Sequence, residues 1–268
     1  MNIRSRKITM ANSDPGSVER TMELLRLLAT AGGYGLALTQ ISEAAKLPHS
    51  TAHRLLHKLI NERMVVQRES NKRYMLGPLT FELGLAASQI YDLREPCRPI
   101  LRRLAEEIGD TVYLTVRSGN ESVCEDRYEG PSTIRVITIE VGSRRPLGQG
   151  AGGLAILAAI PLEEREHMIA HIARRYGTHK SLQERPLRNA IANCQRHCYS
   201  LIRSQVTLGT TAMGVAILDT LDNPIAAISV AAVDSRMSAS RIELLSRQLQ
   251  STAASIRDAL RSFSGQYD

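Results

Sequence analysis

One stretch constrains the fold of this chain more than any other, the run from Leu47 to Leu59. Its leucines and one alanine recur with the 3.6-residue period of a helix, so they predict one apolar face. Ser50, Arg54 and His57 fall on the opposite face, with His53 and Lys58 beside them. A helix that is buried on one side and carries cationic and hydrogen-bonding groups on the other suits the major groove of DNA.

The residues around this helix predict a complete winged helix-turn-helix. Thr39 begins a shorter helix that ends at Ala45, and residues 46–48 form the turn between the two helices. Two β-rich runs, 64–68 and 73–76, follow on either side of a tight turn and predict a wing. Basic side chains cluster around this wing, and we expect them to contact phosphates. Taken singly, each of them would be an ordinary solvated surface charge.

The basic residues are concentrated in the first third of the chain. The 268 residues carry a formal net charge of +7, and residues 1–77 hold 12 Lys+Arg against 6 Asp+Glu. This distribution favours a polyanionic partner for the N-terminal part, with nucleic acid ahead of a membrane surface. Residues 1–16 are polar and basic, and they are expected to form a flexible arm, with contact to the DNA minor groove as the alternative.

The remainder of the chain predicts a connector and an α+β domain. Residues 78–93 form one helix that is apolar on more than one side, which suits a connector that also contributes to a dimer. Helices are then predicted at 95–108, 154–160, 162–174, 183–201 and 238–262, and strands at 111–116, 122–127, 133–141, 211–218 and 224–233. Hairpins with helices on one face describe an α+β fold.

Several classes of protein are disfavoured by what the sequence lacks. The spacing of the four cysteines does not suggest a secreted disulfide framework, and no apolar segment follows the basic N-terminus as in a signal peptide. No apolar stretch reaches the roughly 18 residues of a membrane helix. We therefore expect a cytoplasmic protein with no membrane partner.

Many short motifs, taken in order, resemble the IclR family of bacterial transcription regulators. The likeness covers about residues 17–262. Its motifs are Ser17-Val18-Glu19-Arg20, the run Leu47-Pro48 to Leu56, Arg73-Tyr74 with Leu76-Gly77, Asp126-Arg127 with Glu129-Gly130, Gly142 to Leu147, and Ala226 to Val230.

The resemblance implies a domain plan and a function. The plan is a flexible basic arm (1–16), a winged helix-turn-helix (17–77), a linker helix (78–94) and a GAF-like effector-binding and oligomerisation domain (95–268). It implies a regulator that is not an enzyme, that needs no cofactor, and that binds a pseudo-palindromic operator as a dimer or a dimer of dimers. Family effectors are often carboxylates or aromatic catabolites.

Two sets of site residues follow from the helix-turn-helix pattern and from the resemblance. The expected DNA contacts are Thr39, Gln40, Ser50, Thr51, His53, Arg54, His57, Lys58, Arg68, Lys72 and Arg73. The matched effector positions are Ile134, Ile137, Ala151, Gly152, Ile202, Ala212, Ser229 and Ala231.

The sequence departs from the family at some of these effector positions. A typical member has an acidic residue where Ile202 stands, Glu where Gln205 stands, and Cys or Ser where Ala212 stands. These changes remove charge and hydroxyl groups, so we expect a more apolar pocket that favours an aromatic or otherwise hydrophobic acid. The alternative, that these positions are plain core and the ligand uses others, stays open.

The glycine-rich segment Gly148 to Gly153 fits the dinucleotide pattern G-x-G-x-x-G, but its context does not. No buried strand precedes it, and no acidic residue closes a strand about 20 residues later. Free N–H groups at the start of the helix that follows still favour an anion, such as an effector carboxylate.

Two other functions compete with a ligand-controlled regulator. An enzyme could use Asp126 and Glu129 as a carboxylate pair, although no nucleophile elbow, P-loop or H-E-x-x-H motif occurs. A metal or thiol sensor could use Cys194 and Cys198, one helical turn apart, with His167 or His171 as a further ligand. Buried or half-buried thiols are the plainer interpretation. His49, His53 and His57 form a similar row, for which DNA contact or solvent exposure is expected.

Overall fold

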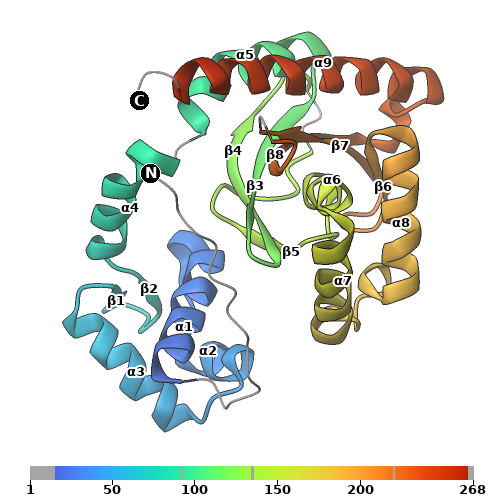
Figure 1. Cartoon of the computed structure of the whole chain (residues 1–268). Helices are drawn as coiled ribbons and strands as arrows, with labels where there is room; N and C mark the ends of the chain where they lie inside the picture. The colour runs from blue at the N-terminus through green and yellow to red at the C-terminus, as the bar shows by residue number, and fades with distance from the viewer. Residues whose placement is uncertain (1–15, 92, 134–135, 220, 265–268) are drawn as a thin grey trace. The chain divides into compact units, whose positions relative to one another are not determined.

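A computed structural model describes residues 16–91, 93–133, 136–219 and 221–264, which divide into two compact units, 1–89 and 90–268 (Figure 1). The first unit contains a winged helix-turn-helix and the second an α+β domain, so the predicted fold class is confirmed. The predicted basic arm lies outside the described residues except for Gly16. The finer division into arm, linker and effector-binding domain stays a prediction.

The first unit is built from short helices and a two-stranded hairpin. Its elements are α1 (Ser17–Ala31), the 3-10 turn η1 (Gly32–Tyr34), α2 (Leu38–Ala45), α3 (His49–Asn61), β1 (Val65–Gln67), β2 (Tyr74–Leu76) and α4 (Pro78–Tyr91). The turn between α2 and α3 is the predicted one, and Lys46 adopts a left-handed conformation there (φ 53°). The second helix begins at Leu38, one residue before the predicted start.

Apolar faces of the first three helices converge on one small core. Leu24 and Leu28 of α1 are buried against Ile41 of α2 and against Leu56 of α3. The periodicity that predicted a helix in the run Leu47 to Leu59 is therefore the periodicity of burial in the fold, because every third or fourth residue of α3 faces this core.

The predicted wing is present and is tied to the loop that precedes α2. Strands β1 and β2 pair in antiparallel register, with Val65 opposite Leu76. Leu36 forms an isolated antiparallel bridge with Tyr74 of β2. Its N–H donates to the Tyr74 carbonyl (2.9 Å), and its carbonyl accepts from the Tyr74 N–H (2.8 Å).

The second unit is a six-stranded antiparallel sheet with helices on both faces. Its elements are α5 (Arg94–Ile108), β3 (Thr111–Ser118), β4 (Glu121–Tyr128), β5 (Arg144–Pro146), α6 (Ala151–Ala159), α7 (Leu162–Tyr176), η2 (Lys180–Leu182), α8 (Glu184–His197), β6 (Ser200–Arg203), β7 (Thr210–Leu218), β8 (Pro224–Val233), η3 (Asp234–Arg236) and α9 (Ala239–Ser264). The strand order across the sheet is β5-β4-β3-β8-β7-β6.

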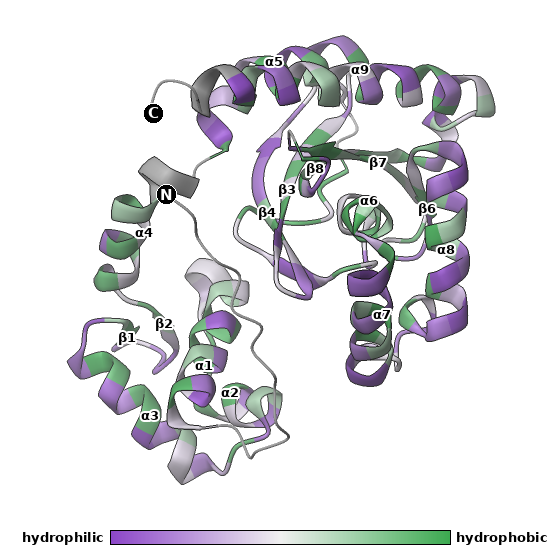
Figure 2. Cartoon of the chain, viewed as in Figure 1, coloured by the Kyte–Doolittle hydropathy of each residue, from purple (hydrophilic) through white to green (hydrophobic). Residues whose placement is uncertain are grey.

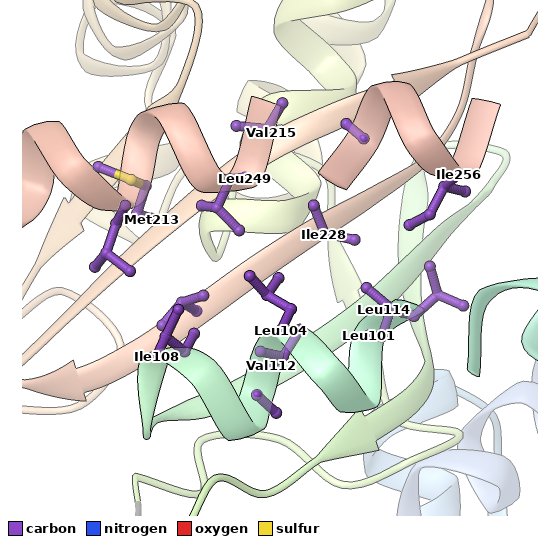
Figure 3. Close-up of a cluster of buried hydrophobic side chains, with 14 of the residues drawn as sticks. Leu101, Leu104, Ile108, Val112, Leu114, Met213, Val215, Ile228, Leu249 and Ile256 are labelled. Carbon is purple, nitrogen blue, oxygen red and sulfur yellow. The ribbon is translucent and has the colours of Figure 1, made fainter. Parts of the chain in front are cut away.

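One face of this sheet carries bulky aliphatic side chains and is covered by α5 and α9 (Figures 1 and 3). Val112 and Leu114 of β3, Met213 of β7 and Ile228 of β8 lie on this face, together with Leu249 of α9. Their alternation along each strand is the two-residue period of a pleated sheet.

The opposite face is lined by small residues, and α6 lies on it. Ala212 and Gly214 of β7 and Ala227 and Ser229 of β8 alternate with the bulky positions of the same strands. Because small side chains leave room, α6 can approach the strands closely. Its residues 151–158 are all buried, and it is hydrophobic along its length (Figure 2). Helix α8 packs against α6, and α7 packs against α8 within the same hydrophobic cluster, so the prediction of helices on one face only was wrong.

Two predicted elements of the second unit differ in the structure. The described part of the predicted strand 133–141 is not a strand, because side chains rather than a neighbouring strand bond its backbone. The predicted helix 183–201 ends at His197, where Cys198 turns left-handed (φ 60°), and Ser200 begins edge strand β6. Strand β6 pairs with β7, and β5, which was not predicted, pairs with β4.

Candidate nucleic-acid interface and ligand pocket

Helix α3 presents the predicted polar face to solvent. Ser50, His53, Arg54, His57 and Lys58 are all exposed, while Thr51 is half-buried. The rings of His53 and His57 lie one turn apart, with centroids 5.6 Å from each other. Among the described residues, the Arg54 and Lys58 side chains have no hydrogen-bond or ion-pair partner, so both cations are available to a ligand.

The two predicted DNA contacts in α2 differ in whether their side chains are already hydrogen-bonded within the protein. Thr39 and Gln40 are both exposed. The Gln40 side chain accepts a hydrogen bond from the Ala37 N–H (3.0 Å), so it caps the helix and stabilises its first turn. Thr39 makes no such bond within the described part of the chain, and its hydroxyl is free to contact a phosphate.

The three basic residues of the wing also have different surroundings. Lys72 is exposed at the turn, where it adopts a left-handed conformation (φ 55°). The Arg68 guanidinium donates to the Gly33 carbonyl (3.1 Å), and that of Arg73 donates to the Gly35 carbonyl (2.9 Å). Both arginines therefore brace the wing against the loop after α1, and Arg73 is half-buried in doing so. Of the three, Lys72 is the one whose charged group has no hydrogen-bond partner among the described residues.

In the second unit, a pocket lies between the small-residue face of the sheet and the N-terminus of α6. Its lining residues are Tyr113, Thr115, Ser122, Thr138, Ile139, Arg145, Gln149, Gly150, Ala151, Gly152, Gly153, Ile202, Gln205, Val206, Thr210, Ala212, Ser229 and Ala231. They come from all six strands of the sheet, from the start of α6 and from the loops beside it.

Six of the eight predicted effector positions meet in this pocket. They are Ala151, Gly152, Ile202, Ala212, Ser229 and Ala231. Ile137 does not line it, because this side chain is 47% exposed on the irregular segment after residue 135. Ile134 lies outside the described residues.

Polar residues that the sequence did not single out also line the pocket. Thr115 and Ser229 direct hydroxyl groups toward α6, and within the described chain these hydroxyls have no hydrogen-bond partner. The Tyr113 hydroxyl donates to the Val136 carbonyl (2.8 Å) and accepts from the Thr138 N–H (3.1 Å). Burial raises the pKa of Tyr113, so its phenol stays protonated at neutral pH.

Arg145 is the cation of the pocket. It stands on β5, and its guanidinium donates to the Thr138 carbonyl. Burial lowers the pKa of Arg145, because the charged form has lost water, but an arginine remains charged at neutral pH. The pocket is thus less uniformly apolar than expected. Strand alternation on β3 could have indicated Tyr113 and Thr115, but no local pattern separates Arg145 from its neighbour Arg144.

The glycine-rich segment serves the fold of this pocket, for two separate reasons. Gly148 and Gly150 have positive φ angles of 91° and 93°, a backbone conformation that residues with a side chain rarely adopt. Gly152 and Gly153 lie close to the sheet, where a β-carbon would come within 2.8 Å of the Thr115 Oγ1 and 2.9 Å of the Ser122 Oγ respectively. The helix begins at Ala151, so the amide groups of its first turn lie at the pocket.

Family models match both units of the chain. The model of the IclR helix-turn-helix domain matches residues 17–69, and that of the bacterial transcriptional regulator IclR C-terminal domain matches residues 85–258. The chain belongs to the IclR family.

Relatives and solved structures agree over nearly the whole chain. The chain is 28% identical to the HTH-type regulator KipR of Bacillus subtilis, over 90% of this chain and 95% of KipR. It is 29% identical to the repressor IclR of Escherichia coli, over 84% of this chain and 83% of that repressor. An IclR-family regulator from Brucella abortus has the same fold (TM-score 0.74, 22% identity, 91% and 92% covered). So does an IclR homologue from Microbacterium hydrocarbonoxydans complexed with 4-hydroxybenzoate (TM-score 0.68, 23%, 92% and 100%).

Membership of the IclR family gives this chain its general function, that of a DNA-binding transcription regulator. IclR proteins are regulators and generally not enzymes. Among the described residues, no helix is both long and apolar enough to cross a membrane.

The cysteines of this IclR protein do not form a cluster suited to metal binding. Cys194 is buried and Cys198 is exposed. Burial raises the pKa of Cys194 to about 12, so this thiol is protonated at neutral pH and is a poor metal ligand or nucleophile. In the parts of the chain that the structure describes, no three His, Cys, Asp or Glu side chains gather around a point that could hold a metal ion.

Proposed function

We propose that this protein is a transcription regulator whose hold on DNA is controlled by an aromatic or otherwise hydrophobic carboxylic acid, bound in the pocket at the start of α6. The observation that carries the proposal is the composition of this pocket. Ile139, Ile202, Val206 and Ala212 supply an apolar wall. The first turn of α6 supplies N–H groups at the positive end of a helix. An apolar wall opposite a cationic end suits an acid with an apolar body.

The likeness to a ligand-bound family member supports this effector class. The Microbacterium homologue was crystallised with 4-hydroxybenzoate, an aromatic acid, and its fold matches this chain over nearly its full length. We propose the same chemical class for this protein, not the same compound.

On the DNA side, the exposed face of α3 is proposed to read base edges. Arg54 is the main candidate, because a guanidinium can bind a guanine with two hydrogen bonds. Lys72 and Thr39 are proposed to contact phosphates. A second copy of the chain would place a second α3 in a successive major groove of a pseudo-palindromic operator, as a dimer or a dimer of dimers.

The effector proposal is tested by direct binding. Isothermal titration of the full-length protein would compare benzoate, 4-hydroxybenzoate and phenylacetate with the small polar acids glycolate and lactate. We expect the aromatic acids to bind and the small acids to bind far more weakly. Tight, selective binding of glycolate or lactate would overturn the proposal.

Regulation is tested on DNA that the protein recognises. Footprinting on the region between its own gene and the neighbouring operon would first locate the operator. Operator affinity would then be measured with and without the bound acid. Effectors typically change the affinity of a coupled site by about 5- to 150-fold. An acid that binds but leaves operator affinity unchanged would show that the pocket does not control DNA binding.

A further inference from the structure

Among the described residues, Arg145 has no carboxylate partner, unlike Arg144 and Arg117 of the same unit. Its neighbour Arg144 pairs with Glu121 (3.0 Å) and bonds Ser118 (2.7 Å), and Arg117 pairs with Glu164 (2.5 Å). Within the described chain, the Arg145 guanidinium bonds only the Thr138 carbonyl, a neutral group. The charge is therefore only partly compensated by the protein.

The surroundings of the Arg145 guanidinium would favour an anion beside it. It is partly withdrawn from water, which lowers the pKa of Arg145. It also lies beside the N-terminus of α6, since a β-carbon on Gly150, the residue before the helix, would be 3.6 Å from its Nη1. That end of a helix carries a partial positive charge. Two positive groups thus adjoin one pocket, and an anion placed there would relieve both.

We propose that Arg145 binds the carboxylate of the effector and so sets the requirement for an acid; this rests on the proposed function of the pocket. The planar guanidinium suits a carboxylate, which it can bind through two parallel hydrogen bonds. The first-turn amides of α6 would complete the anion site. The apolar body of the acid then lies toward Ile139, Ile202 and Ala212, which line the same pocket.

The same guanidinium connects the effector to the segment that borders the pocket. Arg145 bonds the Thr138 carbonyl, while the Tyr113 hydroxyl bonds the backbone of residues 136 and 138. These bonds hold Ile139 at the pocket without a strand ladder. A carboxylate on Arg145 therefore meets a side chain that is already held in position, so little conformational freedom is lost on binding.

The test compares an acid with its neutral amide on matched protein variants. Benzoate and benzamide, and 4-hydroxybenzoate and 4-hydroxybenzamide, have nearly the same shape and differ in charge. Affinities for all four would be measured with the wild-type protein, Arg145→Gln and Arg145→Lys. Arg117→Gln is the control, because it removes the same charge from the same unit at a residue that does not line the pocket.

We expect the wild-type preference for the acid over the amide to fall by about tenfold to a hundredfold in Arg145→Gln, the usual range for a charged hydrogen-bonded pair. Arg145→Lys should keep part of the preference, and Arg117→Gln all of it. Unchanged affinity of Arg145→Gln for the amides would show that this variant keeps its pocket.

Each failure has its own signature. An acid preference that is unchanged in Arg145→Gln and Arg145→Lys would overturn the role of Arg145 while the effector function stands. Inorganic phosphate that binds more tightly than every acid, in an Arg145-dependent way, would overturn the carboxylate assignment. A wild-type protein that binds none of the acids would overturn the proposed function, and the role of Arg145 with it.

Discussion

Gly152 and Thr115 lie so close together that a β-carbon on the glycine would be 2.8 Å from the Thr115 Oγ1 and 3.0 Å from its Cβ. This approach brings α6 against β3 beside the pocket that both residues line. The close packing of α6 on the small-residue face of the sheet thus depends on the absence of a β-carbon at residue 152.

Gly152→Ala is therefore expected to destabilise the second unit and to narrow the pocket. Inserting a methyl group into a packed interior lowers the free energy of unfolding by about 1–3 kcal/mol. Urea unfolding would measure this, and Thr115→Ala in the same chain should recover part of the loss. Gly84→Ala is the control, because nothing lies within 4 Å of its missing β-carbon and alanine favours helix α4. Wild-type stability in Gly152→Ala would contradict the close contact.

Asp110 holds α5, β3 and α9 together through two arginines. Its carboxylate lies 2.7 Å from Arg241 and 3.0 Å from Arg236, and its side chain is only 2% exposed. We expect Asp110→Asn to lower the free energy of unfolding by about 1.5–3 kcal/mol, the range for charged hydrogen bonds. Asp222→Asn removes an exposed partner of Arg257 and should change the free energy of unfolding by less than about 1 kcal/mol. Equal effects of the two variants in chemical denaturation would contradict the prediction.

Cys194 is expected to weaken the fold at alkaline pH. Burial raises the pKa of this thiol from 9.0 to about 12, so the folded state favours the protonated form. The stability this provides is fully present below pH 9 and is lost as the pH rises from 9 toward 12, by up to about 1.4 kcal/mol per pH unit. Unfolding free energies measured across this range should fall less steeply for Cys194→Ala. Cys198→Ala removes an exposed thiol and should leave the slope as in the wild type.

Arg54 and Lys72 should affect DNA binding in different ways. Arg54→Ala is expected to weaken specific binding by about 1–3 kcal/mol and to relax the preference for the operator, since base contacts carry sequence information. Lys72→Ala should weaken all DNA about equally and reduce the salt slope by about 1. Fluorescence anisotropy at several salt concentrations, on operator and scrambled DNA, separates the two. A footprint unchanged by Arg54→Ala would refute the assigned reading face.

The helix-turn-helix and the main hairpins could be predicted from local patterns. Leu55, Leu56 and Leu59 recur at helical spacing because one side of α3 is buried, and that burial leaves its mark on consecutive residues. Strand β8 was predicted with its observed bounds, Pro224–Val233, because it is a long run rich in β-branched and small apolar residues. The resemblance to the IclR family added six of the pocket positions, which no periodicity indicates.

Other features depended on contacts between residues far apart in the chain. Residues 136–141 have the composition of a strand, yet hydrogen bonds from Tyr113 and Arg145 take the place of a ladder. Strand β6 was predicted as helix because its identity comes from pairing with β7. Such tertiary interactions override local propensity.

Local patterns were enough to predict the helix-turn-helix, the position of its wing and the family that the chain resembles, because periodic burial and ordered motifs are local properties of the chain. The role of the glycine-rich segment and the identity of the charge in the pocket follow instead from contacts between residues that are distant in the sequence. Gly152 is glycine because of Thr115, 37 positions earlier. Arg145 differs from Arg144 because the two side chains of one strand point to opposite sides, one toward Glu121 and the other into the pocket.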